Sequence, residues 1–482
     1  MNRKPWGWVG LYLVLVLLPA AISAWAAHAA VLPPRPFWDD LAAGLGMAGM
    51  AIVLLSFWLL GRAKPLSGLL GSDLLMQAHQ LMARTAVVLL LLHPFFYSLW
   101  TAQAGPPDPS ATNALRIGAG SWGLSTGLLA LGCLLALVML AVWRGQSGVS
   151  YERWRLVHSA LALAVLGLGL HHTLVSGRYA QLGPVAAVWW SMALLALGSW
   201  LWVYAVRPVL QGARPYRISQ LARCADQIWL LTLTPAAAPR QTFRAGQFAW
   251  LKLQHRWPHR DNPFSICNAP GPAGELQFLI KEAGDMTRSL AHCPVGAAAY
   301  VDGPHGRFDI PPDAPAVVLY AGGIGVAPLL SLLRGAVARQ DARPLRLIYA
   351  DKIPGQMVDV LRLSGAASLP DFQLLRMVEQ PPEGWDGLVG RLDAAGLHEA
   401  LQDPAMTNMP ADTCHLVCGP EAMLDTVESV LMLRGVPAPR IVSEHFRYDF
   451  TGRSPRARHL RQGWYAVSAA IVLGLVLTLA WR

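Results

Sequence analysis

The sequence predicts a multi-domain membrane protein. A bundle of transmembrane helices comes first, followed by a small antiparallel β-barrel, a parallel α/β domain and one last transmembrane helix. Two observations predict this order. Hydrophobic residues make up 54% of the 482 residues and charged residues only 14%, whereas soluble domains carry about a quarter charged residues. The long apolar stretches lie within 1–206 and 463–482, and the part between them has the composition of a soluble protein.

Seven apolar stretches are long enough to cross a bilayer as helices, which takes roughly 20 residues. They run near 7–27, 38–60, 73–100, 122–143, 156–176, 185–206 and 464–481. We therefore expect an N-terminal helix within 1–37, a helical bundle over 38–206 and a C-terminal helix over 463–482. The basic start and the small residues around Ala24–Ala29 also fit a cleaved signal peptide.

Basic residues beside the stretches predict the orientation, because Lys and Arg accumulate in cytoplasmic loops. If the N-terminus is cytoplasmic, most of them fall on that side, and 207–462 is cytoplasmic as well, as in a bacterial inner membrane protein. The residues are Arg3, Lys4, Arg62, Lys64, Arg144, Arg153, Arg155, Arg207 and Arg214. The net charge of +10 is not gathered in a Lys/Arg tract, which argues against nucleic-acid binding. The six cysteines form no Cys-x-x-Cys pair, which argues against an iron–sulfur cluster or zinc site.

The middle of the chain predicts two soluble domains. Residues 214–310 contain short alternating segments between Gly- and Pro-rich turns, which is typical of an antiparallel barrel. Residues 313–450 alternate buried-type strands with helices, which predicts a parallel sheet covered by helices. The expected strands are 247–253, 276–281, 316–320, 345–349 and 415–418, and the expected helices begin near 328 and 421.

Histidines inside two of the expected spans predict a metal function. Histidine within a membrane is costly and usually functional. His79 and His93 are 14 residues apart, and so are His158 and His172. Fourteen residues turn a helix by about 1400°, which is only about 40° short of four full turns. Both members of each pair therefore share one face of their helix. Both spans run outward, so each membrane level holds two imidazoles, the ligand set of a haem with two axial histidines. Hydrogen-bonded packing histidines are the alternative.

Two further polar residues lie in the same spans. His171 is rotated about 140° from the His158 face, so it is only a fallback ligand. Arg84 lies near mid-depth in its span. It is expected either to pair with a haem propionate or to reach water as an isolated charge.

Glycine turns and an aromatic–hydroxyl pair predict nucleotide cofactors. Asn262–Ile266 can cover a flavin ring and donate a hydrogen bond, and Lys281–Arg288 forms a glycine turn that can hold a pyrophosphate. Gly303–Phe308 is a tight turn. Ala321–Pro328 joins a strand to a helix, where backbone N–H groups favour phosphate, and Cys418–Pro420 repeats this pattern.

These motifs together resemble a known family. The soluble half is similar to the ferredoxin–NADP reductase superfamily, and residues 40–450 resemble ferric reductases and NADPH oxidases. The resemblance implies FAD, two haem b groups and a nicotinamide nucleotide. It also implies that Ser265, Cys418 and Phe446 border the reacting rings, with Phe450 as the alternative to Phe446. The other implied cofactor contacts are Pro263, Phe264, Ile266, Lys281, Gly284, Thr287, Gly322, Gly323, Gly325, Gly419 and Pro420.

The choice of nucleotide depends on two neighbouring residues. Lys352 fits the 2′-phosphate of NADPH, whereas Asp351 fits the free ribose of NADH. The resemblance favours NADPH, because family members often carry a basic residue at this position.

The resulting hypothesis is a membrane oxidoreductase that sends electrons from NAD(P)H through FAD and two haems to an outer small-molecule acceptor. Dioxygen, giving superoxide, and ferric iron are the first candidates. A periplasmic redox protein or a quinone is the second. Alternatives from other classes are a haem sensor, a metal transporter and a flavin reductase merely anchored by its helices.

Overall fold

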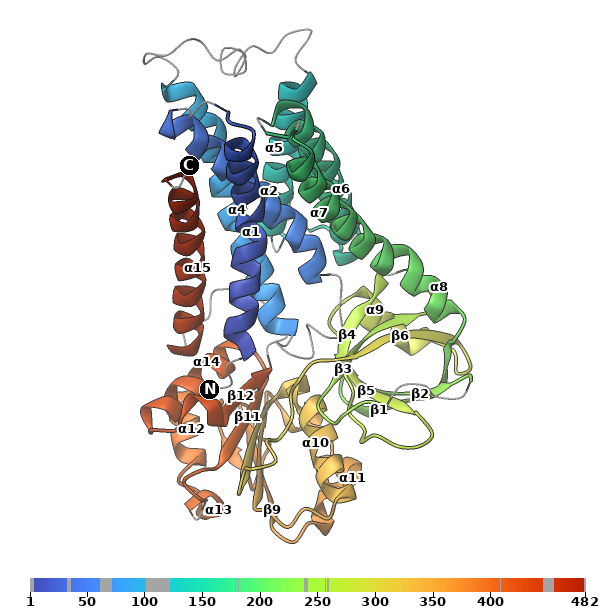
Figure 1. Ribbon diagram of the computed structural model, residues 1–482. Helices are drawn as coiled ribbons and strands as arrows, with labels where there is room; N and C mark the ends of the chain where they lie inside the picture. Colours follow the sequence, from blue (N-terminus) through green and yellow to red (C-terminus); the bar gives the residue numbers. More distant parts are fainter. Residues whose placement is uncertain are drawn as a thin grey trace. The chain divides into compact units, whose positions relative to one another are not determined.

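The computed structural model describes residues 4–480 except 33–35, 61–71, 101–121, 145, 147, 178, 181, 238–241, 256, 258–259, 408 and 445–454 (Figure 1). The chain forms two compact units. The membrane unit contains residues 2–66, 75–205 and 462–482, and the reductase unit consists mainly of Val206–Arg461. Each unit is described by itself.

Seven helices of the described chain contain stretches long and apolar enough to cross a membrane. They are α1 (Lys4–Ala29), α2 (Phe37–Leu60), α4 (Ser72–Trp100), α5 (Trp122–Val142), α6 (Tyr151–Ser176), α7 (Gly183–Leu201) and α15 (Pro455–Ala480). Each expected stretch falls largely on one of these helices. Helix α6 begins at Tyr151 rather than near 156, because the Ser150 side chain accepts a hydrogen bond from the Arg153 N–H and caps the helix.

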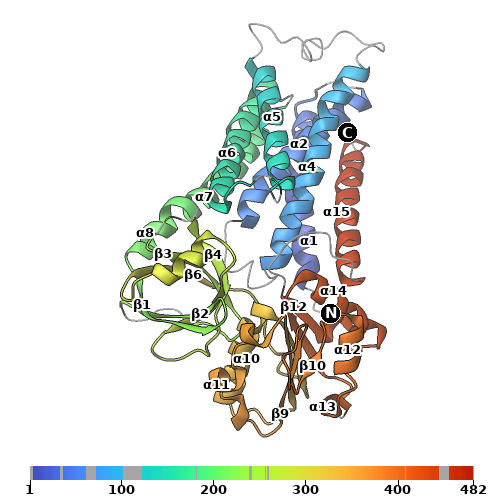
Figure 2. The same cartoon turned by 180° about the vertical axis from the view of Figure 1, so that it is seen from behind.

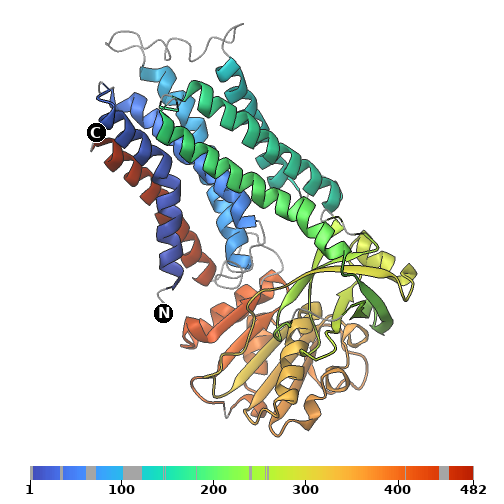
Figure 3. The same cartoon turned by 45° about the vertical axis from the view of Figure 1, so that its right-hand side comes forward.

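The C-terminal helix α15 packs within the bundle. The Thr85 and Ser468 hydroxyl oxygens lie 2.8 Å apart and join α15 to α4. A Cβ atom at Gly474 would lie 2.5 Å from Leu17, so the missing side chain lets α15 approach α1. Figure 3 shows α1 and α15 side by side. A hydroxyl pair inside an apolar bundle indicates specific packing.

The first reductase domain is a six-stranded antiparallel barrel. Its strands are β1 (Tyr216–Ala225), β2 (Ile228–Pro235), β3 (Phe248–Leu253), β4 (Asn262–Ser265), β5 (Leu276–Lys281) and β6 (Ala298–His305), in the order β4-β3-β6-β1-β2-β5. A bridge between Ile266 and Phe278 links the ends of β4 and β5 and closes the barrel. Two short helices flank it, α8 (Arg207–Gly212) before β1 and α9 (Asp285–Arg288) after β5.

The second domain is a six-stranded parallel sheet. Its strands are β7 (Val317–Gly322), β8 (Leu345–Asp351), β9 (Phe372–Val378), β10 (Leu388–Val389), β11 (Cys414–Cys418) and β12 (Ile441–Glu444), in the order β10-β9-β8-β7-β11-β12. Alternate residues of β7 enter two different cores. Helices α10 (Val326–Ala338) and α11 (Val360–Ser364) cover one face. Helices α12 (Ala394–Ala400) and α14 (Glu421–Leu433) cover the other (Figures 1 and 2), and α13 spans Pro404–Thr407.

Arg334 of α10 joins the two reductase domains. Its guanidinium donates to the Cys267 carbonyl oxygen at 3.2 Å and to the Gln277 side chain at 2.6 Å, both in the barrel. It also donates to the Leu363 carbonyl oxygen at 2.7 Å within its own domain. Hydrogen bonds from a charged group are stronger than neutral ones, so this side chain holds the barrel against the sheet domain.

We expect Arg334→Met to lower the free energy of unfolding of the reductase unit by about 2 kcal/mol, because three bonds from a charged donor are lost. Loss of bound flavin during a denaturant titration of the full chain measures the change. Arg339→Met, which removes an exposed arginine of the same segment, is the matched control. Equal midpoints for both variants would contradict the role given to Arg334.

Candidate cofactor sites

The outer histidines of α4 and α6 face each other. The ring centroids of His93 and His172 lie 6.2 Å apart, with the rings at 78°. Nδ1 of His93 lies 2.7 Å from the Ala42 carbonyl oxygen, and Nδ1 of His172 lies 2.8 Å from that of Gly123. Histidines that bind a metal through Nε2 commonly donate Nδ1–H to a backbone carbonyl oxygen in this way.

Two glycines make room for these rings. A Cβ atom at Gly46 would lie 2.7 Å from Nδ1 of His93, and one at Gly127 would lie 2.6 Å from Nδ1 of His172. Any larger residue at either position would displace an imidazole. An imidazole nitrogen binds a first-row metal at about 2 Å, so the 6.2 Å between ring centroids leaves space for one metal ion between the two rings.

The inner histidines form the second pair. His79 lies on α4 and His158 on α6, the same two helices that carry the first pair. Nδ1 of each is buried without a hydrogen-bond partner among the described residues. Buried polar atoms without a partner are rare in folded proteins and call for an explanation. A haem between the two rings would engage one nitrogen of each, so the residues present fit such a group.

His171 and His172 have different surroundings in the structure. His171 is exposed and its Nδ1 lies 3.0 Å from the Thr126 hydroxyl, so it points away from His93. Arg84 lies on α4 between the two histidine levels, and its side chain is exposed on the surface of the unit. This exposure does not decide between its two expected roles.

The glycine turns of the sheet domain meet at one crevice. β7 and β11 are parallel neighbours, with Ala321 opposite Cys418. A Cβ atom at Gly325 would lie 2.2 Å from the Cys418 carbonyl oxygen, and one at Gly419 would lie 3.1 Å from Gly322. The chain reaches β8 on one side of β7 and β11 on the other. Nucleotides bind at such a switch point, beyond the carboxyl ends of the strands.

Asp351 lies at the end of β8 beside this crevice. Its Oδ1 accepts from the Lys352 N–H at 2.8 Å, and its Oδ2 is buried without a partner among the residues that the structure describes. Oδ2 lies 3.7 Å from where a Gly323 Cβ would be. Burial raises the pKa of the Asp351 carboxyl, while Lys281 counteracts this. The Lys352 side chain is exposed.

The flavin motif lies on edge strand β4 of the barrel. Ser265 is 4% exposed, and its hydroxyl has no hydrogen-bond partner in the described part of the chain. The Asn262 side-chain nitrogen is also buried without one. These two groups fit the polar edge of a flavin, which would supply the missing partners. Phe264 is half-buried and Pro263 exposed, while Ile266 belongs to the barrel core.

The expected pyrophosphate turn is held by its own hydroxyl. The Thr287 side-chain oxygen accepts from the Ala283 and Gly284 N–H groups at 2.8 and 2.9 Å and donates to the Gly284 carbonyl. Thr287 therefore stabilises the turn through three hydrogen bonds of its hydroxyl. Lys281 donates to the Gln356 side chain at 3.2 Å across the two domains.

The flavin strand and the nucleotide crevice are joined by short contacts. Phe248 pairs with Ser265, and its ring lies 3.0 Å from where a Gly306 Cβ would be. Glu444 Oε1 lies 3.9 Å from the same point, and Glu444 pairs with Cys418. The sequence-predicted patches thus converge on one region of the reductase unit. Pro420 is exposed at its edge, and Phe446 and Phe450 lie outside the described residues.

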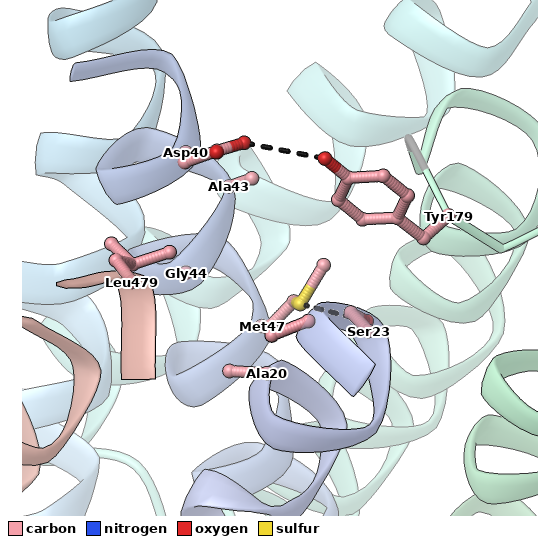
Figure 4. A pocket seen from close by; sticks show the side chains of 9 residues that line it. Ala20, Ser23, Asp40, Ala43, Gly44, Met47, Tyr179 and Leu479 are labelled. Carbon is pink, nitrogen blue, oxygen red and sulfur yellow. Dashed lines mark hydrogen bonds between the residues drawn. The ribbon is translucent and has the colours of Figure 1, made fainter. Parts of the chain in front are cut away.

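The membrane unit also holds a small pocket that the sequence did not indicate. Asp40 and Tyr179 lie on opposite sides of it, and the tyrosine hydroxyl donates to Asp40 at 3.4 Å (Figure 4). Ser23 and Met47 complete the polar part of its lining. The lining comes from distant segments, so no local motif could reveal it. Asp40 lies two residues from Ala42, so an acid and a phenol lie near the His93 level.

Three family models match the chain in the expected order. "Ferric reductase like transmembrane component" matches residues 45–169, "Oxidoreductase FAD-binding domain" residues 223–310 and "Oxidoreductase NAD-binding domain" residues 319–429. His79, His93 and His158 lie inside the first match, and His172 lies just beyond its end.

Individual relatives cover less of the chain. NADH-cytochrome b5 reductase 1 of Cryptococcus neoformans is 31% identical over 182 residues, 36% of this chain and 61% of that protein. The reductase component of propane 2-monooxygenase of Mycolicibacterium goodii is 29% identical over 231 residues, 45% of this chain and 62% of that protein. A ferredoxin reductase structure, from carbazole 1,9a-dioxygenase, has a TM-score of 0.43 at 20% identity and covers 48% of this chain and 69% of its own. The chain thus spans about 61–62% of the length of these curated relatives.

The Cys418 thiol is expected to stay neutral during turnover. Burial, with a contribution from Glu444, raises the pKa of this thiol well above its usual range. The rate of flavin reduction by nucleotide should therefore be constant from about pH 7 to about pH 9.5, where an ordinary thiol with a pKa of about 8.5 would ionise. Anaerobic stopped-flow absorbance measures this rate. A pH-dependent step near 8.5 that disappears in Cys418→Ser would show that the thiol titrates.

Proposed function

We propose that this chain, which joins a ferric reductase-like transmembrane component to FAD-binding and NAD-binding oxidoreductase domains, carries electrons from a nicotinamide nucleotide through FAD and two haems across the membrane. The chain is an oxidoreductase with several membrane helices. The observation that carries the proposal is the opposed pair His93 and His172, each held through Nδ1 by a backbone carbonyl oxygen, with their ring centroids 6.2 Å apart.

The proposal assigns one haem to each level of the bundle. His93 and His172 would hold the outer haem, and His79 and His158 the inner one. Bound flavin accepts a hydride and releases electrons singly, which haem iron requires. The protein contributes orientation: backbone carbonyls fix the outer imidazoles, and Ser265 and Asn262 offer hydrogen bonds to the flavin edge.

We place the terminal acceptor on the outer side of the membrane. The basic residues beside the spans support a cytoplasmic reductase unit, because positive loops are retained there. Dioxygen or ferric iron is the proposed acceptor, and a periplasmic redox protein or quinone is the alternative.

We further propose NADH as the preferred nucleotide, against the initial expectation of NADPH. The open Asp351 Oδ2 beside the Gly323 turn suits the 2′-hydroxyl of a ribose. The same carboxylate would repel a 2′-phosphate. Lys352 is exposed and engages Asp351 through its backbone N–H. The similar cytochrome b5 reductase is named for NADH, which supports this choice.

An anaerobic visible spectrum of the full chain, purified in detergent with FAD, tests the function. Addition of NADH should bleach the flavin and raise sharp bands of low-spin ferrous haem. Well-folded protein without haem bands would exclude the four-histidine arrangement. Haem that NADH leaves oxidised would exclude the route from nucleotide to haem.

His172→Ala should remove about half of the bound haem, because one of the two sites loses a ligand. His171→Ala is the matched control, since His171 is exposed and bonds Thr126. The pyridine haemochrome assay gives the haem content per chain. Loss in the His171 variant with none in the His172 variant would reverse the ligand assignment.

Asp351→Ser should lower the preference for NADH over NADPH about tenfold or more, because the variant has no carboxylate to repel the 2′-phosphate of NADPH. The ratio of kcat/KM for the two nucleotides measures the effect. Lys352→Met is the control and should change this ratio little. A large loss of NADPH activity in the Lys352 variant would favour the opposite assignment.

A further inference from the structure

We propose that Trp154 is a positioning residue that fixes the imidazole plane of His158, and that Arg144 and Tyr151 hold the tryptophan in place. The inference rests on the proposed function, and adds to it three residues outside the ligand set. All of them lie in the membrane unit, at the end of α5 and in the first turns of α6.

The imidazole of His158 is not held in the way the outer ones are. Each outer ring is fixed through Nδ1 by a backbone carbonyl oxygen, that of Ala42 or of Gly123. Nδ1 of His158 is buried without a hydrogen-bond partner among the residues that the structure describes. A hydrogen bond from the second ring nitrogen is what usually sets the orientation of a ligating histidine. For His158, another contact has to set it.

Trp154 supplies that contact from one turn earlier in α6. It precedes His158 by four residues, so the two side chains are neighbours on one face of the helix. Their ring centroids lie 5.0 Å apart, with the rings tilted by 31°, a separation at which aromatic rings attract each other. Rings this close and this nearly parallel overlap partly by their faces. A metal binds in the plane of an imidazole, so the stack leaves that position open.

Trp154 is itself held by three groups. Its indole N–H donates to the Leu140 carbonyl oxygen of α5 at 3.1 Å. The Tyr151 ring lies 5.9 Å from the indole, at an angle of 17°. The Arg144 Cζ atom lies 4.7 Å from the ring centroids of both Tyr151 and Trp154, and a guanidinium is attracted by the electrons of an aromatic face. The indole therefore cannot rotate without losing contacts to both helix ends.

A positioning role differs measurably from simple packing of the helix ends. An aromatic cluster that only packed α5 against α6 would affect both histidine levels or neither. A stack that acts through His158 affects the inner level alone. In a low-spin ferric haem with two axial imidazoles, the g values of the EPR spectrum depend on the angle between the two imidazole planes. Rotation of the His158 ring would therefore move the low-field signal of the inner haem.

EPR spectra of the oxidised full chain, purified in detergent, test the inference. Trp154→Leu keeps an apolar side chain but removes the flat ring, so most of the inner low-field signal should shift or broaden while the outer signal stays. His172→Ala, which is expected to lack the outer haem, identifies the inner signal. Trp190→Leu is the matched control, because Trp190 lies on α7 and is 52% exposed, and both signals should be unchanged.

Two conservative variants grade the effect. Trp154→Phe should restore most of the wild-type signal, because a phenyl ring can still stack on the imidazole. Arg144→Gln should shift the inner signal in the same direction as Trp154→Leu but by less, because the hydrogen bond to the Leu140 carbonyl oxygen still holds the indole.

Haem content is measured first, so that only fully loaded protein is compared. If Trp154→Leu does not fold, Arg144→Gln takes its place, since Arg144 is exposed. An unchanged inner signal, or an equal shift of both signals, would overturn the positioning role. If wild-type protein binds no haem, the proposed function itself fails, so the two failures are distinguishable.

Discussion

The packing of the membrane unit depends on how the outer imidazoles are held. A polar ring inside a membrane needs a hydrogen-bond partner, because no water is present to supply one. For His93 and His172 the partners are carbonyl oxygens of other helices, those of Ala42 and Gly123. Helices α2 and α5 must therefore approach α4 and α6 closely. Glycine at 46 and at 127 permits this approach, because a Cβ atom there would overlap the rings.

Glycine also allows close packing in the reductase unit. A phosphate-bearing cofactor has to meet backbone N–H groups, so side chains must be absent where strands end. Gly325 and Gly419 bring the two turns of the crevice into contact. In both units, glycine allows close approach of a backbone. The bundle uses it to place a side chain, and the sheet domain uses it to leave room for a ligand.

The sequence predicted the fold well where the signal is local or periodic. The 14-residue spacing placed His93 and His172 on facing sides of two helices and set His171 aside, because helical rotation follows directly from residue number. It could not predict partners distant in sequence, such as Ala42 for His93 or Asp302 for Arg207, because a backbone carbonyl or a lone carboxylate leaves no pattern. Thr287 shows a third case. Its hydroxyl, for which the resemblance implies a pyrophosphate contact, bonds backbone groups of its own turn, which the sequence did not indicate.

The chain enters and leaves the reductase unit next to helices that bond α6 and α4 of the membrane unit. The reductase unit begins directly after α7, and α7 bonds α6 through Trp200 and Ser159. It ends at α15, and α15 bonds α4 through Ser468 and Thr85. Helices α4 and α6 are the two that carry the four histidines. A C-terminal helix that served only to anchor the chain would not need a hydroxyl contact between the His79 and His93 levels. The helices that precede and follow the reductase unit in the chain are therefore both bonded to histidine-bearing helices of the membrane unit.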